Sequence, residues 1–505
     1  MSFLYENAVV VSIAAVISIV AWIFGGTRAE LLLPVAPWLA FFLFEMMICF
    51  PQRRSDETLY GARRRTWKSM RRDPLTWTAL AFFLLLLVPF VNNGLCPVCD
   101  CAKITLGANP NPPVKFLPFC VDRIHHLNVV LWFALALPVI VAVKHSLRRR
   151  GKRLLVEMLV WNGAALAVLG FIQAACGATG PLWAELPDGR KAGDFFSTFG
   201  YPNMAGDYFT TIFALAVAAW RRRRDDVIET IANDTENIED GKRRGVFWRK
   251  HFFLLPAAVC FFAALNTLSR ASIMLVTSLA AVFFVHSFVS LTAKKSKALR
   301  IKIGVWCALL LGVVVFFSTV FMPENIRREV DTLDTAVVLD RVTGRGQYHV
   351  RVATEIWKEY PFFGCGGWGY CHFCIPKMTE EEYKDIQQVG GINVHNDYLQ
   401  LLAEHGTIGF GALLAMFIML CIPTAASWKA LMKAVRFAKP KDMPPKPVQI
   451  FVLPAPVFCI FAAIVATLVH SFGDCPLRSP AVLTLFFAAL AAVEGYLPKL
   501  NLNKE

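Results

Sequence analysis

The chain has 505 residues, of which 56% are hydrophobic and only 18% are charged, and its formal net charge is +15. Soluble domains carry about 25% charged residues, and a run of about 20 apolar residues is long enough to cross a bilayer. The composition therefore excludes a chain of ordinary soluble domains, and we predict an all-α polytopic membrane protein.

Apolar runs of membrane-spanning length recur from the N-terminus to the C-terminus. They predict twelve transmembrane helices with one large loop between the ninth and the tenth. The predicted spans lie near residues 8–25, 31–50, 75–95, 125–143, 154–175, 202–220, 251–268, 271–291, 303–321, 407–426, 448–469 and 480–497.

Clusters of Lys and Arg orient these spans. With twelve spans, five basic connections fall on the same side as both termini, among them "KHSLRRRGKR" and "KKSKALRIK". Basic loops are retained in the cytoplasm, so we expect both termini to be cytoplasmic. Anionic lipid head groups are then the partners of the positive charge, and no nucleic acid is needed to explain it.

Three long connections fall on the opposite, periplasmic side. They are the Cys-rich loop 96–124, the loop 177–203 and the large loop 322–397. In the large loop, "RGQYHVRVATEIWKEY" has the spacing of an amphipathic helix, and "PFFGCGGWGY" then ends it with proline and glycines. We therefore expect short helices that cap the membrane domain.

None of the 14 cysteines falls in a predicted cytoplasmic connection, and several lie in the Cys-rich loop and in "CGGWGYCHFC". Two interpretations are open. CxxC spacing beside histidine resembles a zinc ligand set, whereas an oxidising compartment favours disulfides. We favour disulfides on the grounds of the compartment, although the sequence does not give their pairing.

The stretch "GGINVHNDYLQLLAEHGTIGF" places His395, Asn396 and Asp397 directly before an apolar helix that "HGTIG" interrupts. A helix broken at membrane depth is tolerated where it lines a cavity or packs in protein. One interpretation is a polar cap of that helix, which Asn396 or Asp397 can form. The other is a functional site, because histidine can exchange a proton near neutral pH.

Charged residues elsewhere on the periplasmic side favour a site. Arg270 lies between two closely connected spans, Arg341 and Arg345 lie in the large loop, and Asp474 and Arg478 lie in the last outer turn. Arg270 can instead snorkel to lipid phosphate, and Asp474 can pair with Arg478 to close the turn. Guanidinium groups match phosphate bidentately, so these arginines with His395 fit a site that binds phosphate and moves a proton.

These motifs together resemble the O-antigen ligase and polymerase superfamily. The resemblance runs in order from about residue 196 to the C-terminus, through "STFGYPNMAGDYF", which contains Asn203, then "TLSRAS", "GRGQYHVRVATEIWKEY", "HNDYLQLLAEHGTIGF" and "GDCPLRSPA". The first 190 residues match only in hydropathy, and the Cys-rich loop is not part of the pattern.

The resemblance implies a GT-C-like membrane glycosyltransferase whose donor is a glycan on undecaprenyl diphosphate. Its reaction would occur at the outer face of a bacterial inner membrane. His395 would be the general base, and Arg270 and Arg345 would hold the diphosphate. The residues expected at the donor or substrate are Arg341, Asn203, Asn396, Asp397, Asp474 and Arg478. A base that acts on the face opposite the leaving group would invert the anomeric centre. Asp194 and Asp207 stand alone, without a DxD pattern, so we expect a reaction without metal or other cofactor.

The acceptor stays open at this point. A ligase would use a hydroxyl of lipid A–core, a polymerase another lipid-linked glycan, and a protein O-oligosaccharyltransferase a protein hydroxyl. A membrane transporter is the alternative from a different class, because transporters also use broken helices. The sequence shows no inverted repeat, and its titratable residues gather at the outer surface, which favours the enzyme.

Overall fold

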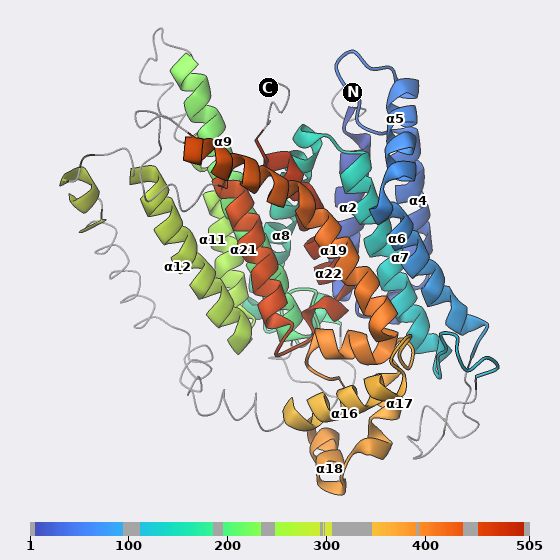
Figure 1. Cartoon of the computed structure of the whole chain (residues 1–505). Coiled ribbons are helices and arrows are strands. Elements are labelled where there is room, and N and C mark those ends of the chain that lie inside the picture. The colour runs from blue at the N-terminus through green and yellow to red at the C-terminus, as the bar shows by residue number, and fades with distance from the viewer. Residues whose placement is uncertain are drawn as a thin grey trace.

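The computed structural model describes residues 6–93, 112–184, 195–233, 248–292, 346–389, 393–437 and 453–498, with a few residues between 296 and 305. Within these ranges the chain is helical, and the only β pairing is two isolated bridges, Asn93 with Cys120 and Phe196 with Phe199. The expected all-α architecture is confirmed for the described part of the chain (Figure 1).

Upright helices form the body of the molecule (Figure 1). In chain order they are α2 (Ala8–Trp22), α4 (Ala36–Cys49), α5 (Leu59–Arg72), α6 (Pro74–Leu87), α7 (Arg123–His145), α8 (Arg149–Ala175), α9 (Pro202–Asn233), α11 (Leu254–Asn266), α12 (Arg270–Thr292), α19 (Asp397–Phe437), α21 (Ala455–His470) and α22 (Pro480–Ala492). Short elements of the large loop are α16 (Gly346–Glu359), α17 (Tyr370–Phe373) and α18 (Glu380–Val389).

A helix that is apolar on all sides lies at the centre of the bundle. All thirteen residues of α22 are buried, as expected of a helix without a polar face. It packs against α7, while α9 packs against α8, α11, α12 and α21. The core thus runs through α7, α9 and α22, and the other helices surround it.

Eleven of the twelve predicted spans coincide with a described helix, and the ninth, 303–321, falls almost entirely outside the described residues. Five described helices are long and apolar enough to cross a membrane, or six if the bent pair α5–α6 forms one span. Four shorter apolar helices are α2, α4, α21 and the segment Pro480–Tyr496. The protein is therefore a multi-helix membrane protein, and a number of twelve spans stays a prediction.

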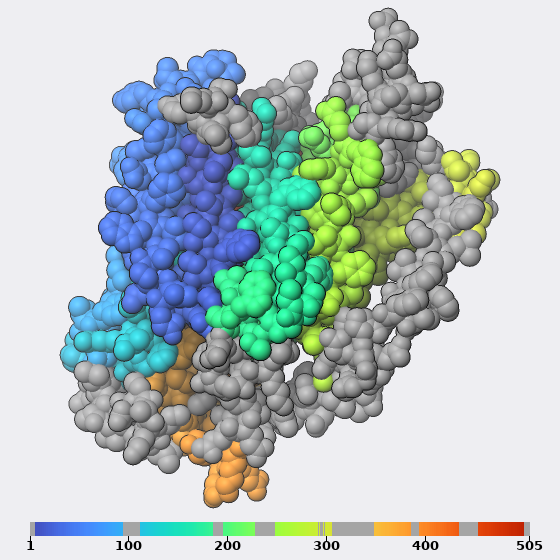
Figure 2. Space-filling view, turned by 180° about the vertical axis from the view of Figure 1, so that it is seen from behind, coloured from blue at the N-terminus to red at the C-terminus, as the bar shows by residue number. Residues whose placement is uncertain are grey.

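The two ends of the bundle differ in chemistry. At one end Gln52 donates to Asn7, and Arg149 donates to the carbonyl of Leu497, so the start of α2 and the region after α22 meet beside the basic segments. Elements α16, α17 and α18 lie at the other end, where α18 protrudes furthest (Figure 1), and the space-filling view shows an orange part of the large loop projecting from the same end (Figure 2).

The predicted interruption of the helix after His395 is a break at Gly406, where φ is +63° and ψ is −172°. The segment 361–366 of the large loop fills the break. Cys365 and Gly366 donate to the carbonyls of Ala403 and Glu404, and Thr407 and Ile408 donate to the carbonyls of Pro361 and Phe362. The large loop thus satisfies the backbone groups that the break releases, as a broken helix within protein requires.

Glycine is required on both sides of this contact. A Cβ atom on Gly406 would lie 2.3 Å from the carbonyl carbon of Phe362, and one on Gly364 would lie 2.4 Å from that of Glu404. Both residues also have positive φ. The two backbones therefore approach closely because neither carries a side chain at the crossing point.

Candidate active site

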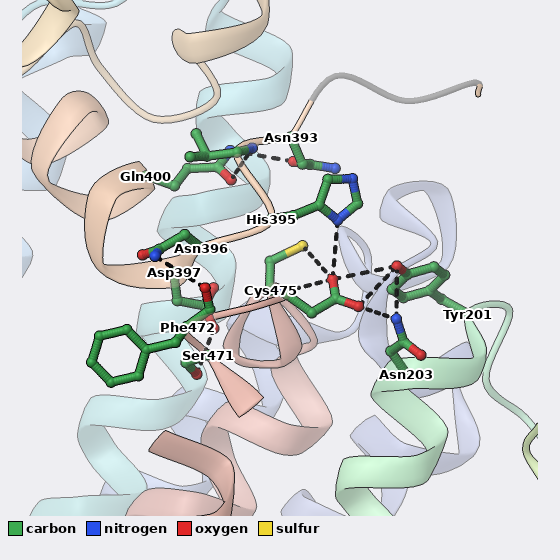
Figure 3. Close-up of polar contacts among 12 residues, drawn as sticks. Tyr201, Asn203, Asn393, His395, Asn396, Asp397, Gln400, Ser471, Phe472 and Cys475 are labelled. Atoms are coloured by element: carbon green, nitrogen blue, oxygen red, sulfur yellow. Dashed lines mark hydrogen bonds and ion pairs between the residues drawn. The ribbon is translucent and has the colours of Figure 1, made fainter. Parts of the chain in front are cut away.

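His395 lies just before α19 and does not cap it. The cap is Asn396, whose Oδ1 accepts a hydrogen bond of 3.0 Å from the backbone N–H of Leu399. His395 itself has a φ of +52°, a left-handed conformation that non-glycine residues adopt rarely and often at functional sites. Its Nδ1 lies 3.3 Å from Oδ1 of Asp474 (Figure 3).

The loop that carries His395 is held by α19. Gln400 accepts a hydrogen bond from the backbone N–H of Val394 and donates to Asn393 at 3.2 Å. These bonds fix both residues before His395 to the second turn of the helix (Figure 3). The strained backbone of His395 is thus fixed from the N-terminal side by Gln400 and from the C-terminal side by the Asn396 cap.

Asp474 is the centre of the polar cluster. Its Oδ2 accepts a hydrogen bond of 3.0 Å from the Tyr201 hydroxyl and another from the Asn203 amide, and its Oδ1 accepts one of 2.7 Å from the backbone N–H of Cys475 (Figure 3). Tyr201 directly precedes α9, and Asn203 lies in its first turn. The cluster therefore joins α9, the turn after α21 and the residue before α19.

The electrostatics follow from these contacts. Burial alone would raise the pKa of Asp474, but the hydrogen bond and charge of His395 outweigh it and lower the pKa to about 2. The hydrogen bond to Asp474 raises the pKa of His395 above its usual value, against the effect of its own burial. Asp474 is thus ionised, and Nδ1–H of His395 donates to it.

Asp397 anchors the turn that carries Asp474. Its backbone N–H donates to the carbonyl of Ser471 at 3.0 Å, and its Oδ2 accepts from the Ser471 hydroxyl at 2.9 Å and from the backbone of Leu477 at 3.1 Å. Asn396 adds a bond of 3.1 Å to the carbonyl of Phe472. The start of α19 and the turn 471–477 are therefore one rigid unit, with His395 and Asp474 on facing sides.

Arg478 does not pair with Asp474, so the salt bridge considered for the last outer turn is wrong. Its Nη1 lies 3.2 Å from both carboxylate oxygens of Glu404, and its guanidinium lies 4.3 Å from the ring centre of Trp368. Arg478 is only 9% exposed. Arg478 thus connects the last outer turn to α19 through Glu404 and to the large loop through Trp368.

A cavity of about 220 Å³ begins beside this pair. It lies between α7, α19 and α22, and most of its lining is apolar, with Asp397, Gln400, Glu404 and Arg478 among the few polar residues. A cavity of this character suits a hydrocarbon chain that ends in a polar group.

The sequence did not single out His349 or Tyr201. His349 lies in α16, is buried, and has its ring centre 6.0 Å from that of His395. Its Nδ1 lies 2.9 Å from the Tyr370 hydroxyl, and burial, followed by the neighbouring charge of His395, lowers its pKa to about 4. The large loop thus contributes a neutral histidine beside the first one, in a helix that the amphipathic pattern had located.

Asp207, which belongs to no DxD pattern in the sequence, has a histidine partner in the structure. Its carboxylate accepts a hydrogen bond of 2.9 Å from Thr467 and lies 3.1 Å from Nδ1 of His470. Asp207 is one helical turn after Asn203, so this second histidine–aspartate pair lies deeper in the bundle than the cluster at Asp474.

The arginines expected at a diphosphate divide into two groups. Arg270 begins α12, and the neighbouring Thr267 and Ser272 pack on Gly206 of α9, next to the helical turn that carries Asn203. Arg270 thus lies at the same end of the bundle as the cluster. Arg341 and Arg345 lie outside the described residues, so their place in the site stays a prediction.

The cysteine pattern of the sequence is consistent with either disulfides or a zinc site. All ten cysteines in the described part of the chain are free, including Cys120, Cys365, Cys371 and Cys374, whereas Cys96, Cys99 and Cys101 lie outside it. Disulfides that involve the latter stay a prediction. Among the described residues, one set of potential metal ligands converges, namely His395, Asp474 and Cys475.

The fold and the site together define a class: an all-helical membrane protein with a histidine–aspartate pair at one end of its bundle, above an apolar cavity. The family model of the O-antigen ligases matches residues 255–414. This match supports the O-antigen ligase and polymerase superfamily and confirms the resemblance seen in the sequence. A search of curated proteins finds no match to the chain. The matched segment includes Arg270 and His395, while Asn203, Asp474 and Arg478 lie outside it.

Proposed function

We propose that this protein is an O-antigen ligase-like glycosyltransferase. It transfers a glycan from undecaprenyl diphosphate to a hydroxyl of lipid A–core at the periplasmic face of the inner membrane. The observation that carries the proposal is the contact of 3.3 Å between His395 and Asp474, inside and beside the segment that matches the O-antigen ligases.

The pair suits general-base catalysis. Asp474 accepts the hydrogen bond from Nδ1–H of His395, so the neutral imidazole has its lone pair on Nε2. In the proposed reaction Nε2 takes the proton of the acceptor hydroxyl as its oxygen bonds to the anomeric carbon. The bond from that carbon to the diphosphate breaks, and undecaprenyl diphosphate leaves. Attack opposite the leaving group inverts the anomeric centre.

Charge on the leaving group needs positive partners. We assign this role to Arg270 and Arg345, because guanidinium forks match phosphate oxygens. Donors aimed at developing charge contribute about 3–4 kcal/mol each in comparable sites. We propose that no metal is required, since diphosphate is a good leaving group once its charge is paired.

The cavity beside Asp397 and Arg478 supports a substrate with a lipid portion. In the proposed complex the donor lipid occupies the apolar cavity, and the reacting sugar phosphate lies at the adjacent polar cluster. A transporter fits this arrangement less well, because the polar cluster lies at the end of the bundle and transporter sites lie near the bilayer midplane.

The acceptor distinguishes the remaining alternatives, a polymerase and a protein O-oligosaccharyltransferase. Purified full-length protein would be incubated with lipid-linked glycan and, separately, with lipid A–core, with a second lipid-linked glycan, and with an unglycosylated protein acceptor. Transfer to lipid A–core alone is expected. Transfer to another acceptor would replace the ligase assignment, and no transfer to any acceptor would contradict the proposed activity.

A further inference from the structure

The side chains of His395, Asp474 and Cys475 converge on one point of the polar cluster (Figure 3). Nδ1 of His395 lies 3.3 Å from Oδ1 of Asp474, and Sγ of Cys475 lies 3.5 Å from the same oxygen. All three potential ligand atoms lie within 4.8 Å of one another. A nitrogen and a sulfur thus both lie within hydrogen-bonding range of one carboxylate oxygen, and the three atoms form a small triangle.

These separations match the edges of a zinc coordination tetrahedron. With Zn–O at about 2.0 Å, Zn–N at about 2.1 Å and Zn–S at about 2.3 Å, tetrahedral angles place oxygen about 3.3 Å from nitrogen and about 3.5 Å from sulfur. Two edges of the triangle therefore have these lengths already. Histidine, carboxylate and thiolate are also the ligand types that Zn²⁺ takes in proteins.

We propose that His395, Asp474 and Cys475 form an inhibitory binding site for Zn²⁺, with solvent in the fourth position. The metal takes the place of the two protons that now join these atoms. The thiol proton of Cys475 is released to solvent, and the proton on Nδ1 of the neutral His395 moves to Nε2. One carboxylate and one thiolate balance the two charges of the ion, so a buried site becomes neutral, which limits the cost of burial.

The position of the metal explains why it inhibits. A neutral imidazole has one N–H, and a metal on Nδ1 leaves that proton on Nε2. Nε2 then has no lone pair to accept the acceptor proton. Zinc therefore blocks the base that a metal-free reaction uses. The inhibition rests on the proposed function, whereas the existence of the metal site does not.

Cobalt is the probe for the site itself. Full-length protein carrying Ser at Cys96, Cys99 and Cys101 would be purified without metal and titrated with Co²⁺ while near-ultraviolet absorption is recorded. A thiolate–cobalt band should reach its maximum at about one equivalent and disappear on addition of Zn²⁺, which binds such ligands more tightly than Co²⁺. The triple substitution removes the alternative CxxC ligands of the Cys-rich loop.

Three variants in that background assign the band. Cys475→Ser should abolish it, and His395→Ala should weaken Co²⁺ binding at least tenfold. Cys176→Ser is the matched control, because it removes an exposed cysteine away from the cluster and should leave the band intact. A band that survives Cys475→Ser would contradict the proposal.

X-ray absorption at the zinc edge of the protein with Ser at Cys96, Cys99 and Cys101, and with Cys475 intact, covers the case in which Cys475→Ser does not fold. One sulfur at about 2.3 Å with nitrogen and oxygen at about 2.0–2.1 Å is expected. A shell with two or more sulfurs would place the metal at other cysteines and overturn the proposal, as would a shell without sulfur. In a transfer assay, Zn²⁺ should inhibit reversibly. Cys475→Ser should need at least tenfold more Zn²⁺ for half-inhibition, relative to its own uninhibited rate.

Discussion

Nδ1 of His395 lies 3.3 Å from Oδ1 of Asp474, although 79 residues of chain separate them. Asn396 takes the capping position of α19, so the side chain of His395 is free to form this contact. The pair, rather than the histidine alone, is the unit from which we derive the chemistry.

The break in α19 should require glycine at position 406. Gly406→Ala places a methyl group against the backbone of Phe362 in a left-handed conformation, which costs at least about 1–3 kcal/mol. Gly411→Ala is the matched control, because its Cβ meets nothing within 4 Å and alanine favours the helix. Thermal unfolding in one detergent should show a lower midpoint for the first variant only. Equal midpoints would mean that the crossing of the two backbones is not tight.

The pH profile of transfer should report His395. Its pKa is raised by Asp474, and the neutral form is the base. The logarithm of kcat/KM should therefore rise with pH and level off above the usual histidine value of about 6.5. Asp474→Asn removes the charge that raises the pKa, so the midpoint should move to lower pH while the rate falls. An unchanged midpoint would show that another group titrates.

The same pair affects stability with opposite signs. The raised pKa of His395 contributes stability at pH values below its unfolded pKa, and this contribution is lost as pH rises through the folded value. The lowered pKa of Asp474 contributes stability above its unfolded value, and this is lost as pH falls toward about 2. A small loss of thermal stability on the alkaline side is expected in the wild type and absent in His395→Gln.

The large loop should be periplasmic. In a background lacking the native outer-face cysteines, a cysteine introduced at Glu381, exposed on α18, should react with a membrane-impermeant thiol reagent in intact cells. A cysteine at Lys68, exposed on α5 at the basic end, should react only after permeabilisation. The reverse pattern would invert the topology and place the site in the cytoplasm.

Arg270 should act on the donor. Arg270→Lys keeps the charge but loses the bidentate fork, and the loss of one charge-assisted hydrogen bond of about 1.5 kcal/mol corresponds to about tenfold in affinity. The donor KM should rise by roughly that factor, with the acceptor KM unchanged. Arg249→Lys, an exposed substitution at the opposite end of the bundle, provides the control. A normal donor KM would favour snorkelling to lipid as the role of Arg270.

Hydropathy located the helices well, because a long apolar run such as Pro480–Ala492 is stable only as a helix buried away from water. The break after Glu404 was also visible, since "HGTIG" places a glycine within an apolar helix. The sequence did not show which residues the site residues contact. Glu404 with Arg478, Asp207 with His470, and His349 with His395 are contacts between distant segments, and no local pattern specifies which charged side chains meet.

The sequence indicates the role of His395 but not that of Asp474. His395 stands in a recognisable motif, whereas Asp474 was equally consistent with a pair to Arg478 four residues later. In the structure Arg478 pairs with Glu404, whose backbone lies against Gly364 of the large loop, and Asp474 pairs with the histidine. Such contacts join segments far apart in the sequence, and local residue spacing does not predict them.

The central claim is that His395 removes the proton of the acceptor hydroxyl. The most direct measurement is single-turnover transfer from lipid-linked glycan by wild-type protein and His395→Gln, each saturated with donor and compared at equal thermal stability. Glutamine can form hydrogen bonds but cannot take the proton, so the rate should fall by about 10²–10⁴ while donor binding is retained. A well-folded His395→Gln variant that transfers at the wild-type rate would contradict the account.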